Sequence, residues 1–258
     1  MTSVGFGRDS TGGFSEALVY GANNGARISS NSWGYDVPDE FDQDELEAID
    51  YAVEQGVIVV FAAGNDDSDD CYYPGCYDKV VAVAAVDNEG VRADFSNYGD
   101  WVDIAAPGVD IWSTVSVDDG YFNPYSGSSM ACPHVAGLLA LGMALNPVQS
   151  VNETIGCLMS TATNIDGKNT EYEMQLGVGM IDALEFVTCI RTAPVPTITP
   201  IPTLSTMPTP TPTKTLTSSS TGAKAAAEMP VARTAAEKQV PLQEEEPTPQ
   251  VLHAQAAG

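Results

Sequence analysis

Residues 125–137 read YSGSSMACPHVAG. Ser129 stands there among small residues, just ahead of an apolar run, which predicts a helix over residues 130–145 with the serine at its N-terminus. Pro133 then falls in the first turn, where its missing N–H costs little. The positive end of the helix dipole favours a negatively charged oxygen near Ser129. Such a serine either acts as a nucleophile, if a base takes its proton, or merely caps the helix.

The segments before this stretch alternate between strand and helix patterns. Residues 57–63 are continuously apolar and rich in β-branched side chains, as a strand covered on both faces is, and residues 79–86 repeat that character after Lys79. Residues 26–32 form a shorter candidate strand. Residues 14–22 and 39–56 have helical patterns. We therefore expect an α/β fold, with a mostly parallel sheet and helices on both faces. In such folds ligands bind beyond the carboxyl ends of the strands.

The composition changes near residue 193. Thr and Pro alternate from there with almost no aromatic residues, and Ala-, Glu- and Gln-rich sequence follows. Such a segment cannot bury enough apolar surface to offset the entropy of ordering it. We expect a globular domain over residues 1–192 and a disordered tail over residues 193–258. The tail is either a stalk, open to O-glycosylation, or a spacer to another domain or anchor.

The net charge limits the class of partner. The sequence has 10 Lys and Arg residues against 35 Asp and Glu residues, a formal net charge of −25. A surface this acidic repels nucleic acid and anionic membranes, so neither is expected as a partner. No apolar run reaches the roughly 20 residues that span a bilayer, so no membrane span is expected.

The five cysteines indicate an oxidising compartment. Cys71 and Cys76 bracket a turn-rich stretch and are candidates for a small disulfide loop. Cys157 and Cys189 are candidates for a second bridge, which leaves Cys132 unpaired. We expect an extracellular or secretory-pathway protein, although the first residues lack the apolar core of a signal peptide.

Several segments together resemble one family. Residues 127–137 closely resemble the nucleophile motif of subtilisin-like serine peptidases, and residues 62–65, AAGN, are similar to the segment that carries that family's oxyanion asparagine. Further similar segments follow in the family's order at residues 73–75, 80–87, 95–99, 103–108 and 177–183. The resemblance covers essentially all of residues 1–192. It implies a subtilisin-like fold and an endopeptidase that cleaves proteins or peptides through an acyl-enzyme.

The resemblance also assigns roles to residues. It makes Ser129 the nucleophile and Asn65 an oxyanion donor, together with the backbone N–H of Ser129. Without it, Asn65 reads as a turn residue at the end of a strand. The substrate-binding walls that the resemblance implies are Ser32, Trp33, Gly34, Ala63 and Gly64, with the first three pairing with the substrate as an added strand.

Two further sites are weaker. Asp103 resembles a carboxylate that supports a structural calcium ion in some family members, with carbonyls near Asp78 and Val80. Calcium binds several oxygens, and only one carboxylate is visible, so a solvated Asp is the alternative. No cofactor is otherwise required. Asn152 begins an Asn-Glu-Thr glycosylation motif.

The base that would activate Ser129 is missing from these motifs. The family's triad runs Asp, His, Ser, and the sequence has two histidines. His253 lies in the tail, and His134 lies five residues beyond Ser129 on one helix, roughly 140° round and about 7.5 Å along. His134 therefore reads as a packing residue. Residues 9–12, DSTG, imitate the aspartate motif but occupy a different loop of the family's order.

We therefore expect an N-terminally truncated peptidase domain, whose triad Asp and His would lie upstream, and a chain that is inactive on its own. A non-catalytic relative that binds peptides or partners through the same cleft is the alternative. A surface protein whose tail carries the function is a third reading. The presence of both Ser129 and Asn65 favours the peptidase, because a binding protein needs neither.

Overall fold

A parallel sheet of four strands forms the centre of the protein. The computed structural model describes residues 13–192, and the predictions for the tail and for residues 9–12 lie outside this range. The strands follow the order β1-β2-β3-β4, and all neighbours pair in parallel. Their bounds are β1 Ile28–Asn31, β2 Ile58–Ala62, β3 Val81–Val86 and β4 Ile104–Pro107.

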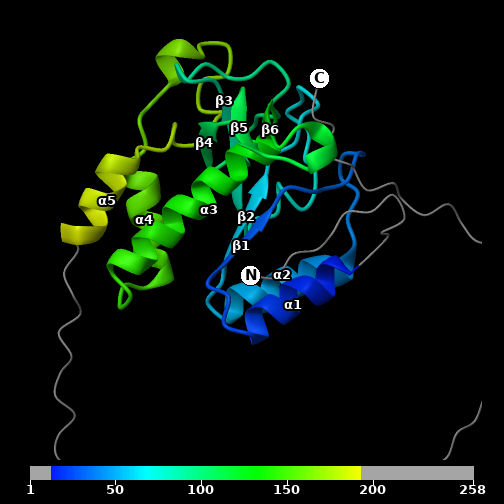
Figure 1. Ribbon diagram of the computed structural model, residues 1–258, viewed down its shortest axis with the longest axis vertical. Helices are drawn as coiled ribbons and strands as arrows, with labels where there is room; N and C mark the ends of the chain where they lie inside the picture. The colour runs from blue at the N-terminus through cyan, green and yellow to red at the C-terminus, as the bar shows by residue number, and fades with distance from the viewer. Residues whose placement is uncertain (1–12, 193–258) are drawn as a thin grey trace, which may run out of the picture. The chain divides into compact units, whose positions relative to one another are not determined.

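Helices cover both faces of this sheet (Figure 1). Helices α1 (Phe14–Asn23) and α2 (Gln43–Glu54) pack together on one face. The other face carries α3 (Ser128–Leu145), α4 (Val151–Ser160) and α5 (Ala183–Thr192). The predicted α/β class, with a parallel sheet between helices, is confirmed.

Strand β2 explains why the sheet is buried on both sides. Ile58 and Val60 belong to the core under α3, whereas Val59 and Phe61 belong to the core under α1 and α2. Successive side chains of a strand point to opposite faces, so an unbroken apolar run satisfies two cores at once.

A hairpin that the sequence did not predict leads into α3. Strands β5 (Ile111–Thr114) and β6 (Phe122–Tyr125) pair in antiparallel fashion, and a 3₁₀ turn at Val117–Asp119 joins them. A second 3₁₀ turn spans Asp166–Lys168. The short strands lack the long apolar runs that revealed β2 and β3.

Helix α3 begins two residues earlier than predicted. It starts at Ser128, so Pro133 lies inside the helix and not in its first turn. The expectation for Pro133 was therefore wrong. Among the helices of residues 13–192, α3 alone has the length and apolar composition of a membrane span, but half of it is buried and it packs on all four strands of the sheet. Core helices of globular domains share these properties.

The structure contains two disulfide bonds in the described region, Cys71–Cys76 and Cys157–Cys189. These are the pairings that the sequence suggested, and Cys132 is free and buried. The first bond closes the loop beside the pocket described below, and the second joins α4 to α5. Both restrict the unfolded chain as well as the folded one.

Candidate active site

The carboxyl ends of β1 and β2 meet the N-terminus of α3 at one pocket. Including open solvent, its volume is about 420 Å³. Parallel strands bring their carboxyl ends to a single sheet edge, which is why segments far apart in sequence converge here. The pocket lining includes every residue that the sequence assigned to catalysis or substrate binding: Ser32, Trp33, Gly34, Ala63, Gly64, Asn65 and Ser129.

Hydrogen bonds to Ser128 fix the orientation of the Asn65 side chain. Asn65 Oδ1 accepts from Ser128 N at 2.8 Å and from Ser128 Oγ at 2.9 Å. Ser128 Oγ in turn accepts from Gly64 N at 3.1 Å. Since its oxygen is occupied, Asn65 has Nδ2 left as a donor, and that nitrogen has no acceptor within residues 13–192.

The backbone N–H of Ser129 is a second unused donor. The neighbouring N–H groups are occupied: Met130 N donates to Gly127 O at 3.0 Å, and Ala131 N to the same oxygen at 3.3 Å. Ser129 N has no acceptor in the described part of the chain, as is common for the first N–H groups of a helix.

Gly127 keeps the space between the two donors open. A Cβ atom at this position would lie 3.6 Å from Ser129 N and 3.8 Å from Asn65 Nδ2. Both nitrogens therefore border the same small volume beside Gly127. Two N–H donors that face one point can stabilise an oxyanion.

Ser32, in the loop after β1, bonds to a backbone carbonyl that Pro133 leaves without a donor in α3. In a regular helix residue 133 would donate its N–H to the carbonyl of residue 129, and proline has no N–H to donate. Ser32 Oγ donates to Ser129 O instead, at 3.0 Å. Ser32 thus satisfies the carbonyl that Pro133 leaves open, and ties the loop after β1 to the helix start.

The pocket walls include residues that the sequence did not assign to the site. Tyr35, Asp66, Tyr72, Gly75 and Ser128 line it as well. Tyr35 N donates to Tyr73 O at 3.0 Å, so the loops after β1 and β2 are joined by backbone pairing that has no local sequence signal. Ser128 had a signal, since it directly precedes the expected nucleophile.

Trp33 belongs to the pocket wall and to the core at the same time. Its ring stacks on Phe14 with centroids 4.1 Å apart and meets the edge of Phe61 at 5.0 Å. The indole therefore spans from the α1–α2 side of the sheet to the pocket. Aromatic contacts of this kind fix the ring beyond what area burial alone would do.

His134 does not contact Ser129 in a way that could serve catalysis. Its Nδ1 bonds to Met130 O at 2.8 Å, and the residue is exposed and absent from the pocket lining. The expected packing role was wrong, because the side chain faces outward from α3. His134 is the only histidine in residues 13–192.

Cys132 is the other nucleophilic side chain on α3. It is fully buried, with Sγ 3.4 Å from Asn31 O. Burial raises the pKa of its thiol to about 11. The thiolate is the reactive form of cysteine, so this residue is a poor nucleophile at neutral pH.

Asp103 fits a calcium site poorly. Its Oδ2 accepts from Ala82 N at 2.8 Å, and burial raises the pKa of the carboxyl. Within residues 13–192 no group of three or more His, Cys, Asp and Glu side chains could hold a metal ion. Calcium ligands are usually several oxygens, including ionised carboxylates. A structural calcium ion near Asp103 stays a prediction.

Asn152 lies exposed in the first turn of α4. Thr154 of the same motif is fully buried, and its hydroxyl donates to Ser150 O at 3.0 Å. In the folded chain the motif is therefore only partly accessible, and glycosylation at Asn152 stays a prediction.

Comparison with known proteins gives the site a family. The chain is 40% identical over 158 residues to a thermophilic serine proteinase from Bacillus sp. (strain AK1), covering 61% of this chain and 38% of that protein. It is 38% identical over 177 residues to alkaline elastase YaB from Bacillus sp. (strain YaB), covering 69% and 44%. Subtilisin BL from Lederbergia lenta is 34% identical over 177 residues, covering 69% and 62%. The chain thus spans 38–62% of the length of these curated relatives.

Solved structures agree with the sequence relatives. The prenylagaramide maturation protease PagA superposes with a TM-score of 0.61 at 28% identity, over 68% of this chain and 66% of that one. The patellamide maturation protease PatA gives a TM-score of 0.62 at 27% identity, over 69% and 67%. The model of the subtilase family matches residues 3–179. The family model, the sequence relatives and the solved structures all agree. The chain therefore belongs to the subtilase family of serine peptidases.

Proposed function

We propose that this chain provides the nucleophile and the oxyanion-binding part of a serine endopeptidase. Ser129 attacks the scissile carbonyl carbon, the amine leaves, and water then hydrolyses the ester on Ser129. The observation that carries the proposal is the pair of N–H donors, Asn65 Nδ2 and Ser129 N, that lack acceptors in the described residues and border one space beside Gly127.

The two donors stabilise the tetrahedral intermediate of each half-reaction. When the nucleophile adds, the carbonyl oxygen of the substrate becomes an anion, and hydrogen bonds in a fixed geometry lower its energy more than that of the planar substrate. Asn65 is already oriented through Ser128, so little reorganisation accompanies the reaction.

The general base comes from a histidine outside residues 13–192. His134 bonds to Met130 O and is directed away from the pocket, so it does not take the proton of Ser129. The surface beside the site suits a further polypeptide segment that carries the base. Strand β1, whose following loop borders the pocket, is at one end of the sheet order in the described residues.

The substrates are proteins or peptides, bound along the loop after β1. The backbone of residues 32–34 borders the pocket, and an extended peptide can add to it as a strand. The two disulfide bonds support an extracellular or secretory location, because such bonds persist in oxidising compartments.

A non-catalytic peptide-binding relative is the second candidate. The same pocket and the same added-strand pairing would serve it. A binding protein would not need two donors without acceptors, Ser129 N and Asn65 Nδ2, to face one space beside Gly127. We therefore prefer the peptidase.

Labelling with a fluorophosphonate tests the proposal, because this probe reacts with an activated serine. The native protein should be labelled, and Ser129→Ala should abolish the label. Ser126→Ala is the matched control, since Ser126 Oγ only accepts from Asp110 N at 2.9 Å, and it should be labelled normally. A native protein that binds peptides but resists the probe would favour the binding relative. Labelling of the 258-residue chain alone that persists in His253→Ala would contradict a histidine base outside residues 13–192.

A further inference from the structure

We propose that Asn97 is a positioning residue for catalysis, which holds the loop of residues 63–68 so that Asn65 faces the oxyanion. The proposal rests on the proposed function, because it concerns the same reaction. Asn97 does not line the pocket and touches no reacting atom. It acts through the backbone of the loop that carries Asn65.

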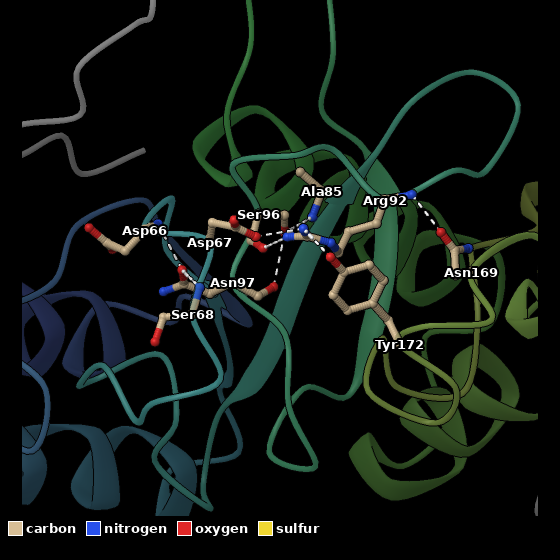
Figure 2. Close-up of polar contacts among 9 residues, drawn as sticks. All are labelled: Asp66, Asp67, Ser68, Ala85, Arg92, Ser96, Asn97, Asn169 and Tyr172. Atoms are coloured by element: carbon tan, nitrogen blue, oxygen red, sulfur yellow. Dashed lines mark hydrogen bonds and ion pairs between the residues drawn. The ribbon is translucent and has the colours of Figure 1, made fainter.

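Asn97 uses both ends of its side chain on this loop. Figure 2 shows the end that contacts Asp66 and Ser68. Its Oδ1 accepts from Asp66 N at 2.7 Å and from Ser68 N at 3.3 Å. Its Nδ2 donates to Ala63 O at 3.0 Å. The side chain therefore spans the loop from the residue two before Asn65 to the residue three after it.

The backbone around Asn97 adds to this support. Asn97 N donates to Gly64 O at 3.1 Å, Asp67 N donates to Phe95 O at 3.0 Å, and Tyr98 N donates to Ser68 O at 3.0 Å. Asn65 is thus flanked on both sides by residues bound to the 95–98 segment. The Asn65 side chain reaches the pocket, and the backbone residues on either side of it hold it in place.

Asn97 itself has little freedom to move. Its side chain is completely buried. The adjacent Ser96 is also fully buried, and its Oγ accepts from Ala85 N of β3 at 2.9 Å while donating to Asn97 O at 3.0 Å. Through Ser96, the backbone of Asn97 is therefore joined to β3 of the buried central sheet.

Arg92 supports the same loop from its outer side (Figure 2). Its guanidinium contacts Asp67 Oδ1 at 2.6 Å and the Tyr172 hydroxyl at 2.9 Å, and it also donates to Ser96 O. The guanidinium lies 4.1 Å from the centre of the Tyr172 ring, so it is fixed by cation–π contact as well.

Asn169 provides a matched control outside the loop that carries Asn65. Its Nδ2 donates to Gly90 O and Ile165 O at 2.9 Å each, and its Oδ1 accepts from Arg92 N at 2.8 Å. Like Asn97, it is a buried asparagine with three hydrogen bonds to the backbone, but it makes none to residues 63–68. The two substitutions to Ala should therefore destabilise the fold to a similar degree.

Kinetics of peptide hydrolysis by the native protein test the proposal. Asn97→Ala should lower kcat by about 10- to 100-fold, with KM changed less than about 3-fold, because misplaced donors weaken binding of the transition state and not of the substrate. Asn169→Ala should leave both constants within about 3-fold. Equal effects of the two variants on kcat would reduce Asn97 to a structural residue.

A double-mutant cycle separates positioning from general support. If Asn97 acts through Asn65, the change Asn97→Ala in an Asn65→Ala background should cost less than about 3-fold in kcat, since the donor that it positions is already gone. Additive losses would overturn the proposal. If Asn65→Ala alone leaves kcat unchanged, the oxyanion assignment fails instead, so the two failures are distinguishable.

Hydrogen exchange gives a readout that does not depend on activity. The Asp66 and Ser68 amide protons should lose protection in Asn97→Ala and keep it in Asn169→Ala. If Asn97→Ala does not fold, Asn97→Asp keeps an acceptor for both amides but sets a carboxylate oxygen against Ala63 O, so the Ala63 end of the loop should shift and kcat should fall. Unchanged kcat in Asn97→Asp, or unchanged exchange of both amides in a folded Asn97→Ala, would contradict the proposal.

Discussion

Two segments lead to the pocket, and they are held in opposite ways. Residues 63–68 are bound by hydrogen bonds to the 95–98 segment and to Ser128 at almost every position. The β5–β6 hairpin is held by its own ladder and at its base, and it exposes Trp112 (71%) and Phe122 (64%). The segment that carries Asn65, the proposed oxyanion donor, is fixed by its surroundings, whereas the hairpin presents Trp112 and Phe122 to solvent. Substitutions should therefore be costly in the first and cheap in the second.

Asn65→Ala should have the largest effect. Losing one oxyanion donor in a related subtilisin costs about 10²–10³ in kcat, and we expect a loss of that order with little change in KM. The matched control is Asn164→Ala, at an exposed asparagine that donates to Asp166 Oδ2 at 2.9 Å and does not line the pocket. Comparable kinetics for the two variants would rule out Asn65 as a donor.

Gly64→Ala should have the next largest effect, on stability. Gly64 has a φ of +105°, and a Cβ there would lie 2.3 Å from Asn97 Nδ2. Backbone strain and overpacking together should cost about 2–4 kcal/mol in the free energy of unfolding, measured by urea denaturation. Gly25→Ala is the control, because Gly25 has a φ of +82° and a Cβ there would have no atom within 4 Å. Its loss of stability measures the backbone strain without the overpacking. Equal losses of unfolding free energy in Gly64→Ala and Gly25→Ala would mean that residues 63–68 can shift to make room for the added Cβ.

Ser32→Ala should have a smaller effect, because it removes one hydrogen bond. It leaves the Ser129 carbonyl without the donor that replaces the missing N–H of Pro133. We expect a loss of about 1 kcal/mol in stability and a fall in kcat/KM. Ser32→Thr keeps the hydroxyl and should recover most of both. If Thr recovers nothing, the hydrogen bond to Ser129 O is not what matters at this position.

Trp112→Ser should have the smallest effect. The side chain is mostly exposed on β5, so the free energy of unfolding should change by less than about 0.5 kcal/mol. Thermal or urea unfolding of Trp112→Ser and Gly64→Ala under the same conditions compares the cost of a substitution in the hairpin with the cost in residues 63–68. A loss above about 2 kcal/mol would show that the hairpin is packed as tightly as residues 63–68, and the comparison would break down.

The sequence predicted the elements whose burial produces a local pattern of apolar residues. Residues 57–63 and 79–86 predicted β2 and β3 closely, because a strand covered on both faces is apolar throughout. Strand β4 and the hairpin strands did not stand out, since each is short and the hairpin is largely exposed. The start of α3 was missed by two residues, because Ser128 enters the helix through bonds to Asn65.

The sequence by itself determined which residues stand at the pocket, through motifs that place Ser129 and Asn65 after predicted elements. Only the tertiary structure decided how they are used. Asn65 is oriented by Ser128, which is 63 residues away, and its loop is held by Asn97, Ser96 and Arg92. Hydrogen bonds are directional and join groups that are distant in sequence, so their geometry leaves no local pattern from which it could be inferred.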